Sequence, residues 1–109
     1  MTASPDQPQS PDDQARLAAK LMAETAKIPW RDLQRFFAQG RAVEVQADTD
    51  LITVAVAISR GAAEQVEAWM AARRVRPVTD KQARRWLCDD ALVWALVVRP
   101  WVLVQAVRE

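Results

Sequence analysis

The fold is decided near the carboxyl end, by residues 92–107, which read LVWALVVRPWVLVQAV. Two apolar runs, Leu92 to Val98 and Trp101 to Val107, flank Arg99-Pro100. Both runs are rich in β-branched and aromatic residues, which favour strands. The first run is apolar on both faces, so we expect a central strand that is covered on both sides. Proline does not adopt the positive φ of a two-residue I′ or II′ hairpin turn. We therefore predict a looser turn at Arg99-Pro100, or a bend in one long strand.

Helical spacing dominates the chain before this run. Residues 11–28 predict one helix that ends or bends at Pro29, and a second helix begins at Pro29 or Trp30. Gly40 is placed to end the second helix in a left-handed turn, and a short strand follows around Val43. Residues 51–59 fit a helix and a strand equally well. Alanine content and aspartate N-caps lead us to prefer the helix.

Two more helices are expected before the apolar runs. One covers residues 62–73, with an inner stripe of Ala62, Val66, Trp69 and Met70. The other begins at the capping box Thr79-Asp80-Lys81-Gln82, extends to about residue 90 and buries Ala83, Trp86 and Leu87. The predicted fold is α+β, with four to five helices packed against a small sheet. This sheet contains the Val43 strand and the two C-terminal strands.

Length and composition indicate one domain. The chain has 109 residues, of which 50% are hydrophobic and 27% are charged. We expect residues 1–10, with two prolines, to form a disordered tail, and residues 11–109 to form a single α+β domain. The longest apolar run has eight residues, 91–98, which is too short for a membrane span of about 18–20. We therefore expect no membrane partner, and the absence of signal-peptide features and of a second cysteine suggests a cytoplasmic location.

The residue inventory narrows the chemistry. The sequence has no histidine, one cysteine and two glycines, so histidine-based catalysis, Cys₂ metal sites and glycine-rich phosphate loops are excluded. We therefore expect no cofactor, no metal site and no enzymatic activity. The weakest hypothesis is an enzyme that uses Cys88 as its nucleophile, with Arg84 and Arg85 nearby to lower the thiol pKa.

Five tryptophans provide the largest apolar side chains. Trp69, Trp86 and Trp94 lie at core-type spacing in their elements. Trp30 and Trp101 each adjoin a proline near the end of an element, so we expect both to be part exposed. Our first hypothesis is a non-catalytic protein-interaction or structural protein that binds an unknown protein partner or forms a homo-oligomer. The predicted surface combines the edge of the C-terminal strand with Trp30, Arg99, Pro100, Trp101 and Gln105.

A basic cluster supports the alternative function, a winged-helix-like nucleic-acid-binding module that uses residues 73–85. Its members are Arg73, Arg74, Arg76, Lys81, Arg84 and Arg85. In that interpretation residues 62–72 form the recognition helix, but Glu64 and Glu67 would repel the DNA backbone. The net charge of the chain is only +1. We therefore favour a solvated face in which the cluster pairs with Asp80, Asp89 and Asp90.

Several stretches together carry a family resemblance. They are ETAKIPW at 24–30, LQRFFA at 33–38 with Gly40, then Val66, Trp69 and Trp86, and VVRPWVLVQ at 97–105. With these the chain resembles the bacterial family catalogued as domain of unknown function 2288, from about Leu17 to Gln105. The family's acidic pair after the third helical stretch is replaced here by Ser59-Arg60-Gly61. The resemblance implies a one-domain bacterial protein and supplies no catalytic residue.

Overall fold

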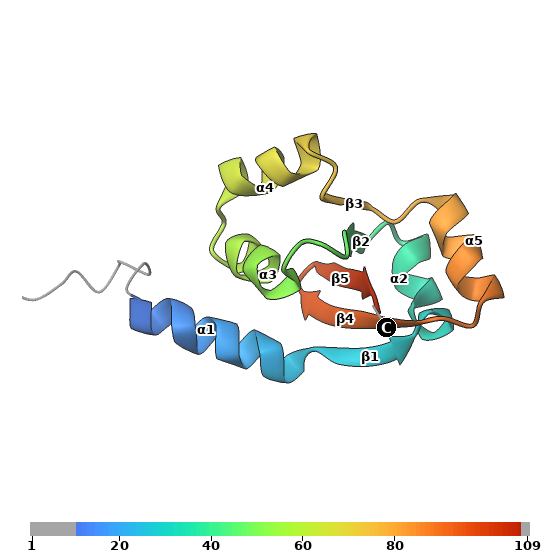
Figure 1. Ribbon diagram of the computed structural model, residues 1–109, viewed down its shortest axis with the longest axis horizontal. Helices are drawn as coiled ribbons and strands as arrows, with labels where there is room; N and C mark the ends of the chain where they lie inside the picture. Colours follow the sequence, from blue (N-terminus) through green and yellow to red (C-terminus); the bar gives the residue numbers. More distant parts are fainter. Residues whose placement is uncertain (1–10, 108–109) are drawn as a thin grey trace, which may run out of the picture.

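The structure is a computed structural model that describes residues 11–107. In chain order (Figure 1) its elements are α1 (Pro11–Glu24), β1 (Ala26–Pro29), the 3-10 helix η1 (Trp30–Leu33), α2 (Gln34–Ala38), β2 (Ala42–Val45), α3 (Leu51–Ser59), α4 (Ala63–Ala71), β3 (Val75–Pro77), α5 (Asp80–Cys88), β4 (Leu92–Val98) and β5 (Trp101–Ala106). No helix within residues 11–107 is long and apolar enough to cross a membrane. The predicted disordered tail, residues 1–10, lies outside the described residues.

The five described strands form one mixed sheet in the order β1-β4-β5-β2-β3. The central strand is β5, which pairs antiparallel with β4 and parallel with β2. Three consecutive residues of β5, Val102, Leu103 and Val104, are buried. Such a run fits a strand that is covered on both faces. The predicted α+β class, with both C-terminal runs in one sheet, is confirmed.

Helices cover the sheet from two sides, because alternate strand residues point to opposite faces. One core joins η1 and α5, through Trp30 and Trp86, to one face. The other core joins α1 and α3, through Leu21 and Val54, to Leu103 on the opposite face. Figure 1 shows α2 and α5 together at one end of the sheet and α3 and α4 at the other. The domain is thus a layered arrangement with the sheet in its middle.

Local capping signals locate two helices correctly. Residues 51–59 are the helix α3, as predicted, and the Asp50 side chain accepts a hydrogen bond from the Ile52 backbone N–H at 3.0 Å. The Thr79 hydroxyl oxygen accepts from the Gln82 N–H at 3.1 Å at the start of α5. Gly40 has φ of 72°, so the predicted left-handed turn after α2 is also confirmed.

Two edge strands were not predicted. The helix expected over residues 11–28 ends at Glu24, and residues 26–29 instead form β1, paired with β4. The helix expected from residue 29 or 30 begins as the 3-10 turn η1 and continues as the short α2. Strand β3 covers only three residues and pairs with β2. Strands this short show no periodicity of their own, and only their sheet partner selects them.

The prediction for the link between the last two strands was wrong. Val98 and Trp101 are paired across β4 and β5, so Arg99-Pro100 forms a tight two-residue connection. The Arg99–Pro100 peptide bond is cis. A cis proline at the third turn position defines a type VI turn, which does not need the positive φ that proline lacks.

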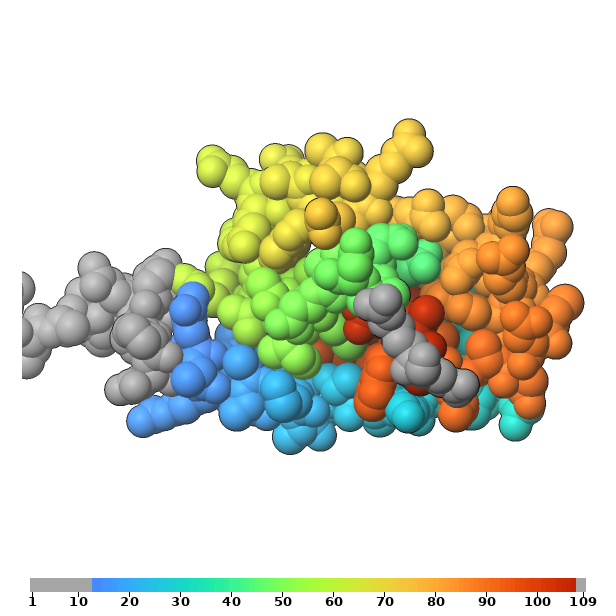
Figure 2. Space-filling model, viewed as in Figure 1, coloured from blue at the N-terminus to red at the C-terminus, as the bar shows by residue number. Residues whose placement is uncertain are grey.

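Two side chains expected in the core are exposed. Leu87 of α5 is 49% exposed, and Met70 of α4 is 48% exposed. Helix α4 contains no fully buried residue, since it contacts α3 and β3 and does not lie across the sheet. Figure 2 shows α4, in yellow, along the upper rim of the molecule. The Met70 side chain is therefore part of a surface.

Candidate functional site

The structure divides the surface that the sequence predicted for a partner. Trp30 has no exposed area, so the expectation of a part-exposed side chain is wrong. The strand edge is also absent, because β5 is central in the sheet. Arg99 and Pro100 form the hairpin tip beside Trp101, which is 39% exposed. Gln105 lies at the other end of β5, about 13 Å along the strand.

Trp30 is buried because it lies beneath other rings. Its ring centroid lies 5.1 Å from that of Trp86 and 5.8 Å from that of Phe37. The backbone N–H of Trp30 donates a hydrogen bond to the carbonyl oxygen of Ala91, which ties η1 to the start of β4. A tryptophan that follows Pro29 in sequence therefore becomes the centre of a core.

Trp101 lines an apolar groove of about 350 Å³. One side is formed by Val66 and Met70 of α4, and another by Val43 and Val75 of the sheet. Trp101 and Met70 are each more than a third exposed. Large apolar side chains that remain exposed around a hollow are typical of a binding surface.

The predicted basic cluster extends from the turn after α4, through β3, to α5. Arg76 pairs with Glu44 at 3.4 Å and Arg74 pairs with Asp48 at 3.9 Å. Within residues 11–107 the other cluster members, Arg73, Lys81, Arg84 and Arg85, form no ion pair. The expected pairing of the cluster with Asp80, Asp89 and Asp90 is wrong. Asp90 pairs with Arg31 at 2.8 Å.

Three members of the cluster share one hollow. Arg76, Lys81 and Arg85 line a depression of about 420 Å³ with Thr79 and Gln82. Arg76 also lines the Trp101 groove, so the apolar groove and the basic hollow adjoin at this residue. Arg84 points to a different hollow and is separated from them.

Cys88 is exposed at the last residue of α5. Among the described residues no group of three or more His, Cys, Asp or Glu side chains could hold a metal ion. The thiol adjoins Asp89 in sequence, and its role as a nucleophile stays a prediction.

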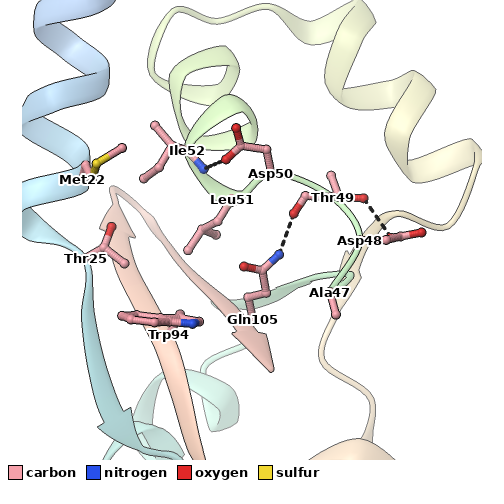
Figure 3. A pocket seen from close by; sticks show the side chains of 10 residues that line it. All are labelled: Met22, Thr25, Ala47, Asp48, Thr49, Asp50, Leu51, Ile52, Trp94 and Gln105. Atoms are coloured by element: carbon pink, nitrogen blue, oxygen red, sulfur yellow. Dashed lines mark hydrogen bonds between the residues drawn. The ribbon is translucent and has the colours of Figure 1, made fainter. Parts of the chain in front are cut away.

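A further pocket, of about 560 Å³, lies at the end of β5 that is far from Trp101. Figure 3 shows the ring of Trp94 beside Gln105, with Met22 of α1 and Thr25 after it on one side and residues 47–52 on the other. Trp94 is half-buried and was expected in the core. The only sequence signal for this pocket is Gln105, which is a polar residue within an apolar strand and is paired with Trp94.

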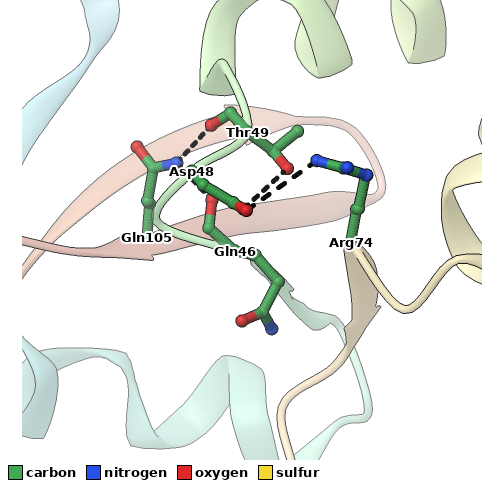
Figure 4. Close-up of polar contacts among 5 residues, drawn as sticks. All are labelled: Gln46, Asp48, Thr49, Arg74 and Gln105. Carbon is green, nitrogen blue, oxygen red and sulfur yellow. Dashed lines mark hydrogen bonds and ion pairs between the residues drawn. The ribbon is translucent and has the colours of Figure 1, made fainter.

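Gln105 fastens a loop to the sheet (Figure 4). Its side-chain amide Nε2 donates to the carbonyl oxygens of Gln46 at 2.8 Å and Thr49 at 2.6 Å. The same loop carries Asp48, which accepts from the Thr49 hydroxyl and pairs with Arg74. The loop between β2 and α3 is thus held in place as one wall of the pocket.

Comparison with known proteins gives a family but no activity. A solved structure, the NMR solution structure of PA1075 from Pseudomonas aeruginosa, is similar with a TM-score of 0.76 and 38% identity. The match covers 98% of this chain and 95% of that one. No curated protein matches the chain. Residues 16–106 match the family described as protein of unknown function (DUF2288), and the chain belongs to this family.

Proposed function

We propose that this chain is a non-catalytic protein-interaction domain. Its partner is a peptide segment that places an apolar side chain in the Trp101 groove and acidic side chains in the adjoining basic hollow. The observation that carries the proposal is the continuity of these two hollows through Arg76. A cytoplasmic location is part of the proposal and rests on the single cysteine.

Trp101 is held as a preformed anchor. The guanidinium Nε of Arg41 donates to the carbonyl oxygen of Pro100 at 2.9 Å. The Val102 N–H donates to the carbonyl oxygen of Arg41. The indole is therefore presented by a short turn that is fastened at both ends. Preorganised tryptophans are frequent hot spots of binding, because little side-chain entropy is lost on association.

The charges of the basic hollow favour an acidic partner there, whereas the groove itself is lined in part by Glu67 and takes the apolar side chain. Lys81 and Arg85 have no ion-pair partner within residues 11–107, whereas Arg76 is neutralised by Glu44. A carboxylate that enters the basic hollow would therefore meet two uncompensated cations.

Binding of a partner as an added β-strand is disfavoured. The edge strands of the sheet are β1 and β3, and each ends in a proline, Pro29 and Pro77.

Peptide display tests this proposal directly. Selection on the wild type, with counter-selection on Trp101→Ser, should enrich peptides that combine apolar and acidic residues. A synthetic copy should bind Trp101→Ser about thirtyfold or more weakly, because a tryptophan anchor contributes at least about 2 kcal/mol. Leu92→Ser is the matched control, since Leu92 is 50% exposed but does not line the groove. Equal binding to both variants would contradict the proposal.

The charge contribution has its own prediction. The double variant Lys81→Ala/Arg85→Ala should bind the selected peptide about threefold to tenfold more weakly and with less salt dependence. Arg16→Ala/Lys20→Ala removes the same charge from α1 and should leave the affinity unchanged. Isothermal titration at low and high salt measures both effects. If the control variant weakens binding equally, net charge rather than the hollow is responsible.

Nucleic-acid binding is the second candidate, favoured by the four cluster members without ion pairs. The exposed residues Glu64 and Glu67 of α4 oppose it. If nucleic acid is the partner, affinity for a single-stranded oligonucleotide should fall steeply between about 50 and 200 mM salt. The same affinity should fall when Arg73, Arg74, Arg84 and Arg85 become alanine. No retention on heparin at low salt would exclude this function, and a concentration-dependent solution mass would instead indicate self-association.

A further inference from the structure

The Trp94 pocket is separate from the Trp101 groove and shares no lining residue with it. Trp94 is the middle of a row across three strands, with Lys27 on β1 and Gln105 on β5 as its cross-strand partners. The apolar side chains of Leu51 and Ile52 are also part of the lining. A pocket of about 560 Å³ has the size that small-molecule sites commonly have.

Gln105 and the two threonines of this pocket already use their side-chain hydrogen-bond donors. Both hydrogens of the Gln105 amide have an acceptor, one in Gln46 and one in Thr49. The Thr25 hydroxyl donates to the carbonyl oxygen of Leu21 at 2.8 Å, and the Thr49 hydroxyl donates to Asp48 at 3.3 Å. Among the described lining residues, the Trp94 indole N–H is therefore the one side-chain donor that remains free for a ligand.

Hydrogen-bond acceptors remain for a ligand among the residues that line the Trp94 pocket, and two of these residues, Asp48 and Asp50, are charged. The amide oxygen of Gln105 has no partner within residues 11–107, and Figure 3 shows it turned toward the Trp94 side of the pocket. The Thr25 oxygen retains acceptor capacity. Asp48 and Asp50 are among the residues that line the same pocket. Asp48 shares its charge with Arg74 at 3.9 Å. Asp50 has no ion pair among the described residues, and its two oxygens accept from the Ile52 N–H and the Thr53 hydroxyl.

We propose that the Trp94 pocket binds a small organic cation that carries N–H donors, such as a primary ammonium on a short alkyl chain. The ammonium donates to the free acceptors and is neutralised by Asp50 and Asp48. The alkyl chain packs against Leu51 and Ile52. The face of the Trp94 ring attracts the cation.

The ring already attracts a cation of the protein itself. The Lys27 ammonium lies 5.1 Å from the Trp94 ring centroid. A bound cation would meet repulsion from Lys27 and compete with it for the ring. Removal of this lysine should therefore improve binding, a gain that damage to the fold does not produce.

Titration of the ¹⁵N-labelled protein with butylammonium, followed by NMR, tests the site. Saturable shifts are expected for the Trp94 indole N–H and the Gln105 side-chain amide, whereas butyrate should leave both signals unchanged. Asp50→Asn should weaken butylammonium binding about threefold to tenfold. Asparagine is as good an N-cap as aspartate, so this variant removes the charge and keeps α3 capped. Asp89→Asn, which removes an equal charge at the end of α5, should have no effect.

Two further variants bear on the ring. Lys27→Gln should tighten butylammonium binding about threefold, and Trp94→Phe should weaken it by a similar factor, as the size of a cation–π contact requires. Three results would overturn the proposal: no saturable shift at Trp94 and Gln105, equal binding of butyrate, or an unchanged affinity in both Asp50→Asn and Lys27→Gln. Saturable binding of a capped lysine peptide without binding of butylammonium would also overturn the proposal, since the pocket would then bind a lysine side chain of a peptide and not a small free cation.

Discussion

Replacing Trp30 with alanine should lower the free energy of unfolding by about 3–5 kcal/mol. The side chain has no exposed area and contacts the rings of Trp86 and Phe37. Deleting it leaves a cavity between η1, α5 and the sheet that these rings cannot refill without breaking their own packing. Urea denaturation monitored by far-ultraviolet circular dichroism measures the loss as a shift of the unfolding midpoint.

Trp30→Phe keeps this prediction testable if the alanine variant fails to fold. The Trp30 indole N–H is buried and has no hydrogen-bond partner among the described residues. Phenylalanine removes this unsatisfied donor, which offsets part of the lost ring area. The loss should therefore be less than half of that for alanine. Trp101→Ala is the control and should lower the free energy of unfolding by less than about 1 kcal/mol. If it lowers the free energy of unfolding as much as Trp30→Ala does, burial is not the reason for the effect at Trp30.

The sequence was informative where the determining interaction is local. Asp50 caps α3 and Thr79 caps α5, each through a backbone N–H two or three residues away. The apolar runs 92–98 and 101–104 form the two strands inside the sheet. Such signals need no knowledge of the partner element. The central strand is β5 and not the first run, β4, whose predicted cover on both faces is incomplete because Leu92 and Val97 are exposed.

The sequence was uninformative where a distant partner decides. Residues 26–29 continue the helical spacing of α1, and only their pairing with residues 92–95 makes them a strand. The same pairing draws Trp30 under β4, which removes it from the predicted partner surface. Proline beside a tryptophan indicates the end of an element. It does not say whether that end lies at the surface.

The two candidate sites also differ in whether a local sequence signal predicts them. Trp101 was expected to be exposed because Arg99 and Pro100 precede it, and it does line a groove. The Trp94 pocket had no comparable signal, because its lining comes from four separate segments of the chain. Spacing within one element cannot reveal such a pocket, and only the register of Trp94 with Gln105 brings its parts together.

Replacing Arg76 with leucine should lower the free energy of unfolding by about 1–3 kcal/mol, because it leaves the Glu44 carboxylate without its partner. Glu44 is the one charged side chain of residues 13–107 that is buried, at 6% exposure. The Arg76 Nε lies 3.4 Å from its Oε1. Arg76 itself is partly exposed, so the loss should be smaller than for a fully buried pair. Thermal and urea unfolding provide the measurement.

Arg74→Leu is the matched control two residues away. Its pair with Asp48 joins two exposed side chains at 3.9 Å, and such pairs contribute about 0–1 kcal/mol. Equal losses for the two variants would show that the burial of Glu44 has no energetic consequence.

A double variant separates the structural role of Arg76 from its proposed role in binding. Glu44→Gln/Arg76→Leu removes the stranded charge, so it should recover at least half of the stability that Arg76→Leu loses. Its affinity for an acidic peptide should stay close to that of the wild type, because the pair that it removes is neutral and Lys81 and Arg85 remain. If Arg76 itself bound the peptide, the double variant would regain stability without regaining affinity. The two measurements together therefore decide whether Arg76 joins the two hollows only as a part of the fold or also as a contact.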